Sequence, residues 1–194
     1  VHKTADVADS AQLASTAKVW HYAQIREDAR IGENVVVGRG AYIGAAVEIG
    51  DNSKIQNYAL VYEPAHLGSG VFIGPAVVLT NDQFPRAVNG DGTPKSATDW
   101  EPVGVTVMDG ASIGAQSVCV APVRVGKWAL IGSGSTVLKD VPNFALAVGS
   151  PARRIGWVGK AGHPLQSRED SVWVCPVTGD QYRQIDDNTL IELE

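Results

Sequence analysis

The sequence contains few aromatic, sulfur-containing and basic residues. Among 194 residues there are three Phe, one Met and two Cys, and 16 Lys plus Arg stand against 21 Asp plus Glu, which gives a formal net charge of −5. An acidic chain is poorly suited to general nucleic-acid binding, which uses a basic surface. The two cysteines, Cys119 and Cys175, are far apart in the sequence and do not suggest a disulfide framework.

Long hydrophobic runs are also missing. No apolar run approaches the length of a membrane span, and the first residues, "VHKTADVADSAQ", do not resemble a signal peptide. Together with the scarcity of cysteine, this leads us to expect a cytoplasmic protein in a reducing compartment. We expect no nucleic-acid partner and no membrane partner.

The sequence does contain a repeat of six residues. Val, Ile or Leu occupies thirteen consecutive positions six residues apart, from Val7 to Leu79, and the pattern returns from Val107 to Val137, interrupted by Cys119. No helix has a period of six. Triplets such as "AYI" and "VFI" alternate as strands do, and the Gly-, Asp- and Asn-rich triplets between them are typical of turns. The sequence therefore predicts an all-β coil of short strands.

This repeat resembles the hexapeptide-repeat superfamily, which implies a left-handed parallel β-helix with three strands per coil. We expect this domain over residues 1–158, with one extruded loop at about 80–106, and a small C-terminal appendage over 159–194 made of a linker and a hairpin-like cap. Stacked residues should then be eighteen apart, with coils about 4.8 Å from each other. Counting by eighteen predicts an outward row of Gln12, Arg30, Glu48, His66 and Phe84 on one face.

A second outward row is apolar towards its C-terminal half and contains Gln24, Tyr42, Leu60 and Val78. An exposed apolar strip indicates an interface, and the superfamily resemblance implies a homotrimer with sites between subunits. A tail folded over the strip is the alternative explanation.

Longer stretches resemble one branch of the superfamily more closely. These are "VWHYAQI" (19–25), "KIQNYALVYE" (54–63), "VFIGPAVVLTNDQFPR" (71–86) and the segment from "GASIG" to "GSPARRIGWVG" (110–159). They are similar to the N-acetyltransferases that act on UDP-2-acetamido-3-amino-2,3-dideoxyglucuronate in bacterial surface-polysaccharide pathways, including lipopolysaccharide biosynthesis. The resemblance covers about residues 5–160 and implies acetyl transfer from acetyl-CoA to a nucleotide-linked amino sugar.

Three alternatives stay open. The acceptor can be another sugar, or a hydroxyl group in place of an amine. The fold is also shared by γ-type carbonic anhydrases, which hold a metal with three His, but the four His of this chain are scattered. A non-catalytic β-helix is the third alternative, although the long loop argues against it.

Acetyl transfer to an amine needs a positioned amine, donors for the developing oxyanion and a proton acceptor. The resemblance places Asn81 at the acceptor amine. Counting by eighteen places Glu63 one coil away, about 5 Å from Asn81, where its carboxylate would hold the amine or take its proton. A solvated turn residue is the alternative reading of Glu63. We expect Asn81 and Glu63 to be catalytic.

Substrate contacts are expected from five residues. Gln56 and Asn57 are amides in a turn that we expect beside Tyr62, and they suit a uracil ring or a sugar hydroxyl; Asn57 would otherwise stabilise its turn. The others are Arg86 and His21. Tyr58 stands where the related enzymes have a second Asn, which leaves the identity of the sugar open.

The cofactor is expected to be acetyl-CoA as co-substrate, and no metal is expected. Backbone amides and small residues of the C-terminal coils would form its groove, with basic residues meeting the phosphates. The candidates are Ala115, Gly132, Ser133, Lys139, Arg153 and Arg154. Cys175 lacks the second cysteine of a zinc knuckle.

The loop that interrupts the repeat begins with "LTNDQFPRAVNGDG" (79–92). A long loop in a compact repeat protein is usually functional. We expect it to form a wall of the active site, with Asn81 at its root, and to extend towards a neighbouring subunit.

Overall fold

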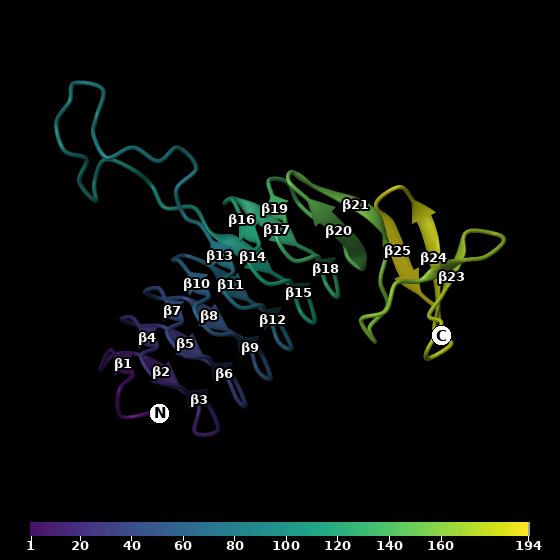
Figure 1. Cartoon of the computed structure of the whole chain (residues 1–194), viewed down its shortest axis with the longest axis horizontal. Helices are drawn as coiled ribbons and strands as arrows, with labels where there is room; N and C mark the ends of the chain where they lie inside the picture. Colours follow the sequence, from purple (N-terminus) through teal and green to yellow (C-terminus); the bar gives the residue numbers. More distant parts are fainter. Residues whose placement is uncertain (194) are drawn as a thin grey trace.

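The chain folds into a stack of three-sided coils (Figure 1). The computed structural model describes residues 1–193, and within them the regular structure consists of β-strands only. Each coil contributes one short strand to each of three parallel sheets, which we call sheets A, B and C. None of the described residues forms a helix that could cross a membrane.

The three sheets run the length of the stack. Sheet A contains β1 (Asp6–Val7), β4 (Gln24–Ile25), β7 (Tyr42–Ile43), β10 (Leu60–Val61), β13 (Val78–Leu79), β16 (Val118–Cys119) and β19 (Thr136–Val137). Sheet B contains β2 (Gln12–Leu13), β5 (Arg30–Ile31), β8 (Glu48–Ile49), β11 (His66–Leu67), β14 (Val105–Val107) and β17 (Val123–Val125). Sheet C contains β3 (Lys18–Val19), β6 (Val36–Val37), β9 (Lys54–Ile55), β12 (Phe72–Ile73), β15 (Ser112–Ile113), β18 (Leu130–Ile131), β20 (Ala145–Gly149) and β21 (Ala152–Trp157), of which β21 is antiparallel.

The strand register has the predicted spacing of eighteen residues. Leu60 pairs with Tyr42 on one side and with Val78 on the other. The repeated aliphatic residues, such as Ile55 and Ile73, are fully buried inside the prism. Period-two alternation points the preceding residue of each strand outward, so the sequence repeat sets both the core and the surface.

The corners hold tight turns that need small buried residues and left-handed backbone. Ala23, Ala41 and Ala59 are fully or almost fully buried at corners. The residue before each of them has a positive φ: Tyr22 (59°), Gly40 (62°) and Tyr58 (60°). Gly adopts this conformation readily, whereas an aromatic residue does so rarely.

Residues 80–104 form the extruded loop between β13 and β14 (Figure 1). It leaves the stack at the corner between sheets A and B and is anchored at its root, where the Val103 N–H donates to the Asn81 carbonyl at 3.0 Å. The prediction that Phe84 continues the outward row of sheet B is wrong. Phe84 lies in the loop with 75% of its surface exposed, and Thr106 of β14 pairs with His66 in its place.

The C-terminal appendage is a four-stranded antiparallel sheet, larger than the single hairpin expected. It consists of β22 (Gln166–Ser167), β23 (Val172–Val174), β24 (Gln181–Asp186) and β25 (Thr189–Glu192). The ring of the buried Tyr182 packs 5.3 Å from that of Phe144 in the last coil, and Trp157 Nε1 donates to Gln184 Oε1 at 3.2 Å. The appendage therefore covers the C-terminal end of the stack (Figure 1).

Candidate active site at two corners of the β-helix

The predicted site residues are distributed over two corners of the prism. The corner between sheets C and A, called the C–A corner, holds His21, Gln56, Asn57, Ala115, Gly132 and Ser133. The corner between sheets A and B, called the A–B corner, holds Tyr62, Glu63, Asn81 and Lys139, and the loop that carries Arg86 starts there. Arg153 and Arg154 lie on β21. The expectation that Gln56 and Asn57 lie beside Tyr62 is wrong within one chain, because β10 separates the two corners.

Glu63 and Asn81 do stack on successive coils of the A–B corner. The register pairs Val61 with Leu79, and the Tyr62 N–H donates to the Leu79 carbonyl at 3.3 Å. Both side chains are half-buried. No hydrogen bond within residues 1–193 joins them, because the Glu63 carboxylate turns towards Gly44 in the preceding coil, where a Cβ would collide with its Oε2.

The Glu63 carboxylate has an unusual environment. Its Oε2 is buried and has no hydrogen-bond partner in the described part of the chain. Burial, together with the negative charge of Glu63, raises the pKa of Tyr42, while Arg26 acts in the opposite direction. The Tyr42 and Tyr62 rings lie 5.1 Å apart and line the same corner. A carboxylate oxygen without a partner can accept a hydrogen bond or a proton from a ligand.

Other turns of the prism show the usual role of a side chain at the turn position of Glu63. A turn Asp or Asn accepts a hydrogen bond from a backbone N–H of the preceding coil, and a glycine in that coil leaves room for the side chain. The pairs are Asp51 with Glu33 N (2.7 Å), Asn57 with Arg39 N (2.9 Å), Asp109 with Ser69 N (3.1 Å) and Asn143 with Lys127 N (2.9 Å). Asn57 therefore stabilises its turn. Glu63 occupies an equivalent position over Gly44, but its Oε2 makes no such bond.

The candidate cofactor residues Ala115 and Ser133 continue the C–A corner on successive coils towards the C-terminal end. From His21 to Ser133 there are five coil steps, a length of about 24 Å. Gly114 lets the coils approach closely, because a Cβ there would lie 2.5 Å from the Ser133 nitrogen. The C-terminal part of this corner, around Ala115 and Ser133, is therefore an edge of small residues.

The three candidate cations for phosphate binding come together. Lys139, Arg153 and Arg154 line one cavity of about 260 Å³ at the C-terminal end of the coils. Arg154 also donates to the Asp187 carbonyl at 2.7 Å and lies 4.3 Å over the Trp157 ring. Arg154 therefore helps to hold the appendage against the stack.

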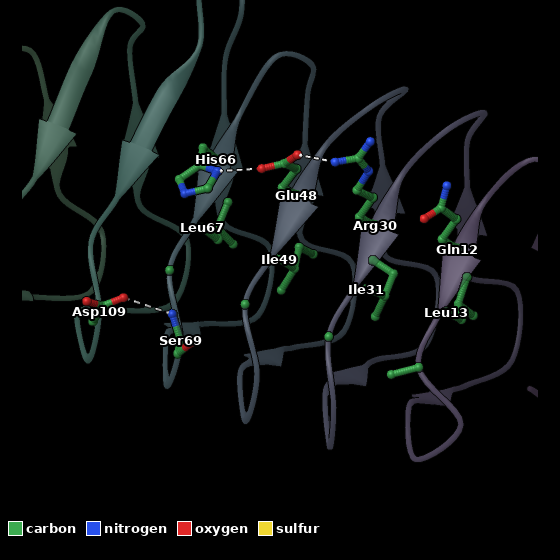
Figure 2. A pocket seen from close by; sticks show the side chains of 14 residues that line it. Gln12, Leu13, Arg30, Ile31, Glu48, Ile49, His66, Leu67, Ser69 and Asp109 are labelled. Atoms are coloured by element: carbon green, nitrogen blue, oxygen red, sulfur yellow. Dashed lines mark hydrogen bonds and ion pairs between the residues drawn. The ribbon is translucent and has the colours of Figure 1, made fainter.

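A cavity of about 690 Å³ forms a groove on sheet B and contains none of the predicted site residues. Figure 2 shows Gln12, Arg30, Glu48 and His66 in one row above the buried aliphatic residues. Glu48 pairs with Arg30 and with His66, both at 3.2 Å. These exposed polar groups are paired with one another, and exposed ion pairs such as Arg30 with Glu48 contribute little free energy.

A cavity of about 270 Å³ at the C–A corner includes residues that the sequence analysis did not single out. Trp20 and Arg39 line it together with the expected His21, Gln56 and Asn57. Tyr58, which stands where the resembled enzymes have a second Asn, lies on this corner with 54% of its surface exposed. This difference in the sequence therefore pointed to the corner that holds the cavity. Trp20 lies in the stretch "VWHYAQI" (19–25), and counting by eighteen places Arg39 on the corner of His21, but neither was expected to contact the substrate.

The histidines lie at three separate places. The His2 and His21 rings stack at 3.5 Å, His66 lies on sheet B, and His163 lies between β21 and β22. Across residues 1–193, no three His, Cys, Asp or Glu side chains form a group that could hold a metal ion. Cys119 and Cys175 are both buried and free.

Comparison with known proteins agrees with this architecture. The bacterial transferase hexapeptide family (six repeats) matches residues 10–45 and 46–81. The sequence-based expectation of an all-β, left-handed parallel β-helix of hexapeptide repeats is confirmed.

The similar proteins include two that are acetyltransferases by name and one named as a bifunctional protein. The dTDP-3-amino-3,6-dideoxy-alpha-D-galactopyranose 3-N-acetyltransferase of Aneurinibacillus thermoaerophilus is 42% identical over 80 residues, 41% of each chain. The bifunctional protein GlmU of Thermotoga maritima is 38% identical over 115 residues, 58% of this chain and 22% of GlmU, so the chain spans about a fifth of that relative. A hexapeptide-repeat acetyltransferase of Vibrio cholerae, solved with acetyl coenzyme A, has the same fold, with a TM-score of 0.53, 21% identity and coverage of 67% and 70%.

Proposed function

We propose that this hexapeptide-repeat β-helix is a cytoplasmic, acetyl-CoA-dependent N-acetyltransferase that acts on a nucleotide-linked amino sugar in surface-polysaccharide biosynthesis. The observation that carries the proposal is the pair of Asn81 and Glu63 on successive coils at the root of the extruded loop, with the Glu63 Oε2 buried and unpartnered. The named activity of the Aneurinibacillus relative supports an amino sugar as acceptor. We infer a UDP-3-amino sugar from the residues "KIQN", "VYE" and "TN".

The reaction needs a positioned amine, a proton acceptor and donors for the oxyanion. The side chains of Asn81 and Glu63 are suited to the first two roles. The Asn81 side-chain oxygen accepts a hydrogen bond from the acceptor amine and orients its lone pair towards the thioester carbon. The C–N bond forms, the C–S bond breaks, and CoA leaves as a thiolate, which is then protonated by the acid form of Glu63 or by solvent. The Glu63 carboxylate receives the proton that the amine loses. Backbone N–H groups of the corner turns are the candidate donors for the oxyanion.

A homotrimer explains why the site residues occupy two corners. The outward row of sheet A is apolar and half-buried at Tyr42, Leu60, Val78 and Val118. Packing sheet A of three copies around a common axis buries this row and places the C–A corner of one chain against the A–B corner of the next. Gln56 and Asn57 then lie at the same coil height as Glu63 of the neighbouring copy, in a site between subunits.

The C-terminal coils are the proposed acetyl-CoA site. The edge of small residues through Ala115 and Ser133 fits an extended chain, and the cavity with Lys139 and Arg153 supplies positive charge for phosphates. Arg86, on the loop, is exposed and available to a substrate phosphate or carboxylate.

The test is release of CoA across a panel of UDP- and dTDP-linked 3-amino sugars. We expect release with at least one amino sugar and none with the matched sugar that carries a hydroxyl in place of the amine. A dTDP-linked sugar as the best acceptor would favour the substrate class of the Aneurinibacillus relative. Absence of release with every member would defeat the proposal.

The trimer is tested separately by light scattering. Leu60→Glu places a charge in the outward row of sheet A and should yield monomers. Thr106→Glu, a matched change in the outward row of sheet B, should leave the mass unchanged. Monomeric wild-type protein at micromolar concentration would contradict the assembly.

A further inference from the structure

The N-terminal part of the C–A corner carries an exposed aromatic cluster. Trp20, Tyr22 and Tyr58 have 49%, 61% and 54% of their surfaces exposed. Isolated exposed aromatic residues are common, but Trp20 and Tyr22 share one turn and Tyr58 lies two coils further along the same corner, so the three form a patch. The patch is therefore a candidate binding surface.

The turns of this patch have the same backbone as the other turns of the prism. Tyr22 and Tyr58 hold left-handed φ values of 59° and 60°, and Ala76 and Gln116 hold similar values at the same corner. The Tyr58 ring also lies over Gly40, where a Cβ would be 2.6 Å from a ring carbon. Gly40 thus provides space for the ring.

A cation lies within the patch without an acidic partner. The Arg39 guanidinium lies 5.3 Å over the Tyr22 ring, and nothing in residues 1–193 forms an ion pair or side-chain hydrogen bond with it. An arginine held over an aromatic ring and free of carboxylates is well placed to bind a phosphate.

The cavity beside this arginine is lined by two nearly parallel rings and by the amide of Gln56. Trp20, His21, Arg39, Gln56 and Asn57 line its volume of about 270 Å³. The Trp20 and His21 rings are nearly parallel, at 12° and 6.2 Å. The Gln56 carboxamide has no partner among residues 1–193, so it offers one acceptor and two donor hydrogens. Uracil and thymine present the complementary set, two carbonyl oxygens and one N–H.

We propose that this cavity binds the pyrimidine base and diphosphate of a nucleotide-linked sugar, with Trp20 stacking on the base, Gln56 reading its edge and Arg39 on the diphosphate. The inference rests on the proposed function for the identity of the complete substrate. It places the nucleotide near the N-terminal coils. Gln56 lies at the coil height of Glu63, and Trp20 lies two coil steps below that height. The sugar would then extend from the cavity towards Glu63 and Asn81.

The test measures binding of free UDP and dTDP by titration calorimetry, with inorganic pyrophosphate and ADP as comparison probes. We expect UDP or dTDP to bind once per chain and more tightly than pyrophosphate or ADP. Because stacking contributes strongly to base binding, Trp20→Ala should weaken this affinity about tenfold or more, and Trp20→Phe should restore it to within about threefold. Arg39→Gln should weaken UDP binding but leave uridine binding unchanged. Phe72→Ala removes an exposed aromatic residue of sheet C outside the cavity and should change nothing.

Other outcomes overturn the inference and are distinguishable from failure of the proposed function. UDP and dTDP affinities unchanged in both Trp20→Ala and Arg39→Gln would refute it, as would equal affinity for pyrophosphate and UDP. Loss of the assembly in Trp20→Ala, seen by light scattering, would show that the patch contacts a second copy of the chain. If UDP binds as expected but no amino sugar releases CoA, the proposed function fails while the nucleotide site stands. Release of CoA with a KM unchanged by Trp20→Ala would refute the site and leave the acetyltransferase.

Discussion

Glu63→Gln is the most informative single change, because the structure predicts opposite effects on stability and on turnover. Oε2 of Glu63 is buried, has no hydrogen-bond partner within residues 1–193 and lies against the Gly44 turn. A buried polar group without a partner destabilises a protein by about 1–3 kcal/mol. Since the side chain is half-buried and solvent reaches part of it, we expect the lower end of this range.

Replacing the carboxylate by the neutral amide should therefore raise the free energy of unfolding by about 1 kcal/mol, or Tm by about 2–4 °C in a chain of this length. A general base typically contributes a factor of about 100 to 10,000, so kcat should fall at least about 100-fold. The pKa of Tyr42 should move down towards its usual value, because the charge of Glu63 helps to raise it.

The measurements are thermal unfolding, CoA release and an ultraviolet pH titration of tyrosine. Glu27→Gln is the matched control: Glu27 lies on the same corner two coils earlier, is exposed and pairs with Arg26 at 2.9 Å, so turnover should not change. Full turnover of Glu63→Gln across the pH range would refute the role as proton acceptor. A clear loss of stability would refute the claim that its carboxylate is unsatisfied.

Three further predictions concern the same region and the turns. Asn81→Ala should lower kcat about 100-fold with little change in Tm, because its side chain makes no hydrogen bond within residues 1–193; unchanged turnover would exclude it from the site. Deleting residues 86–100 should impair CoA release far more than folding, measured by circular dichroism, and equal losses would count against the loop as a site wall. Asp109 has a lowered pKa because Ser69 N–H and Lys127 favour its charged form. Its stabilising effect is therefore present above the unfolded pKa of about 3.9 and lost as pH falls through the folded value. The stability difference from Asp109→Asn should thus disappear in acid-unfolding measurements at low pH, and a difference independent of pH would contradict this origin.

The fold is predictable from the sequence because every coil repeats the same local requirements. Each aliphatic residue from Val7 to Leu79 must point inward, and small residues such as Ala41 must fill the corners. These constraints are local and occur many times, so the period of six determines the three sheets. Phe84 breaks the rule because the repeat carries no information about where an inserted loop returns to the stack.

The site is less predictable, since its geometry depends on single contacts that occur once. The direction of the Glu63 carboxylate depends on Gly44 below it, and the binding of Arg154 to the appendage depends on the ring of Trp157. The Trp20 cavity depends on the large side chains that Trp20 and Arg39 place on two turns, and the repeat pattern does not specify these residue types. The sequence therefore predicts which corner a residue occupies, but it does not predict which side chains contact one another.

The turn positions that lack the usual hydrogen bond to the preceding coil identify the site better than any residue type does. Across the prism, a turn Asp or Asn folds back over a glycine and accepts a backbone N–H, as Asp51 does over Gly32. Glu63 lies over Gly44, but its Oε2 accepts no hydrogen bond. At the equivalent position below Asn81 the chain has Tyr62 and not glycine, so the Asn81 side chain has no space to turn back over the preceding coil. Within residues 1–193 its amide makes no hydrogen bond at the root of the loop. Two neighbouring coils thus give up the same stabilising bond at one corner. Local rules that fail together in this way are expected where function, rather than folding, selects the residues.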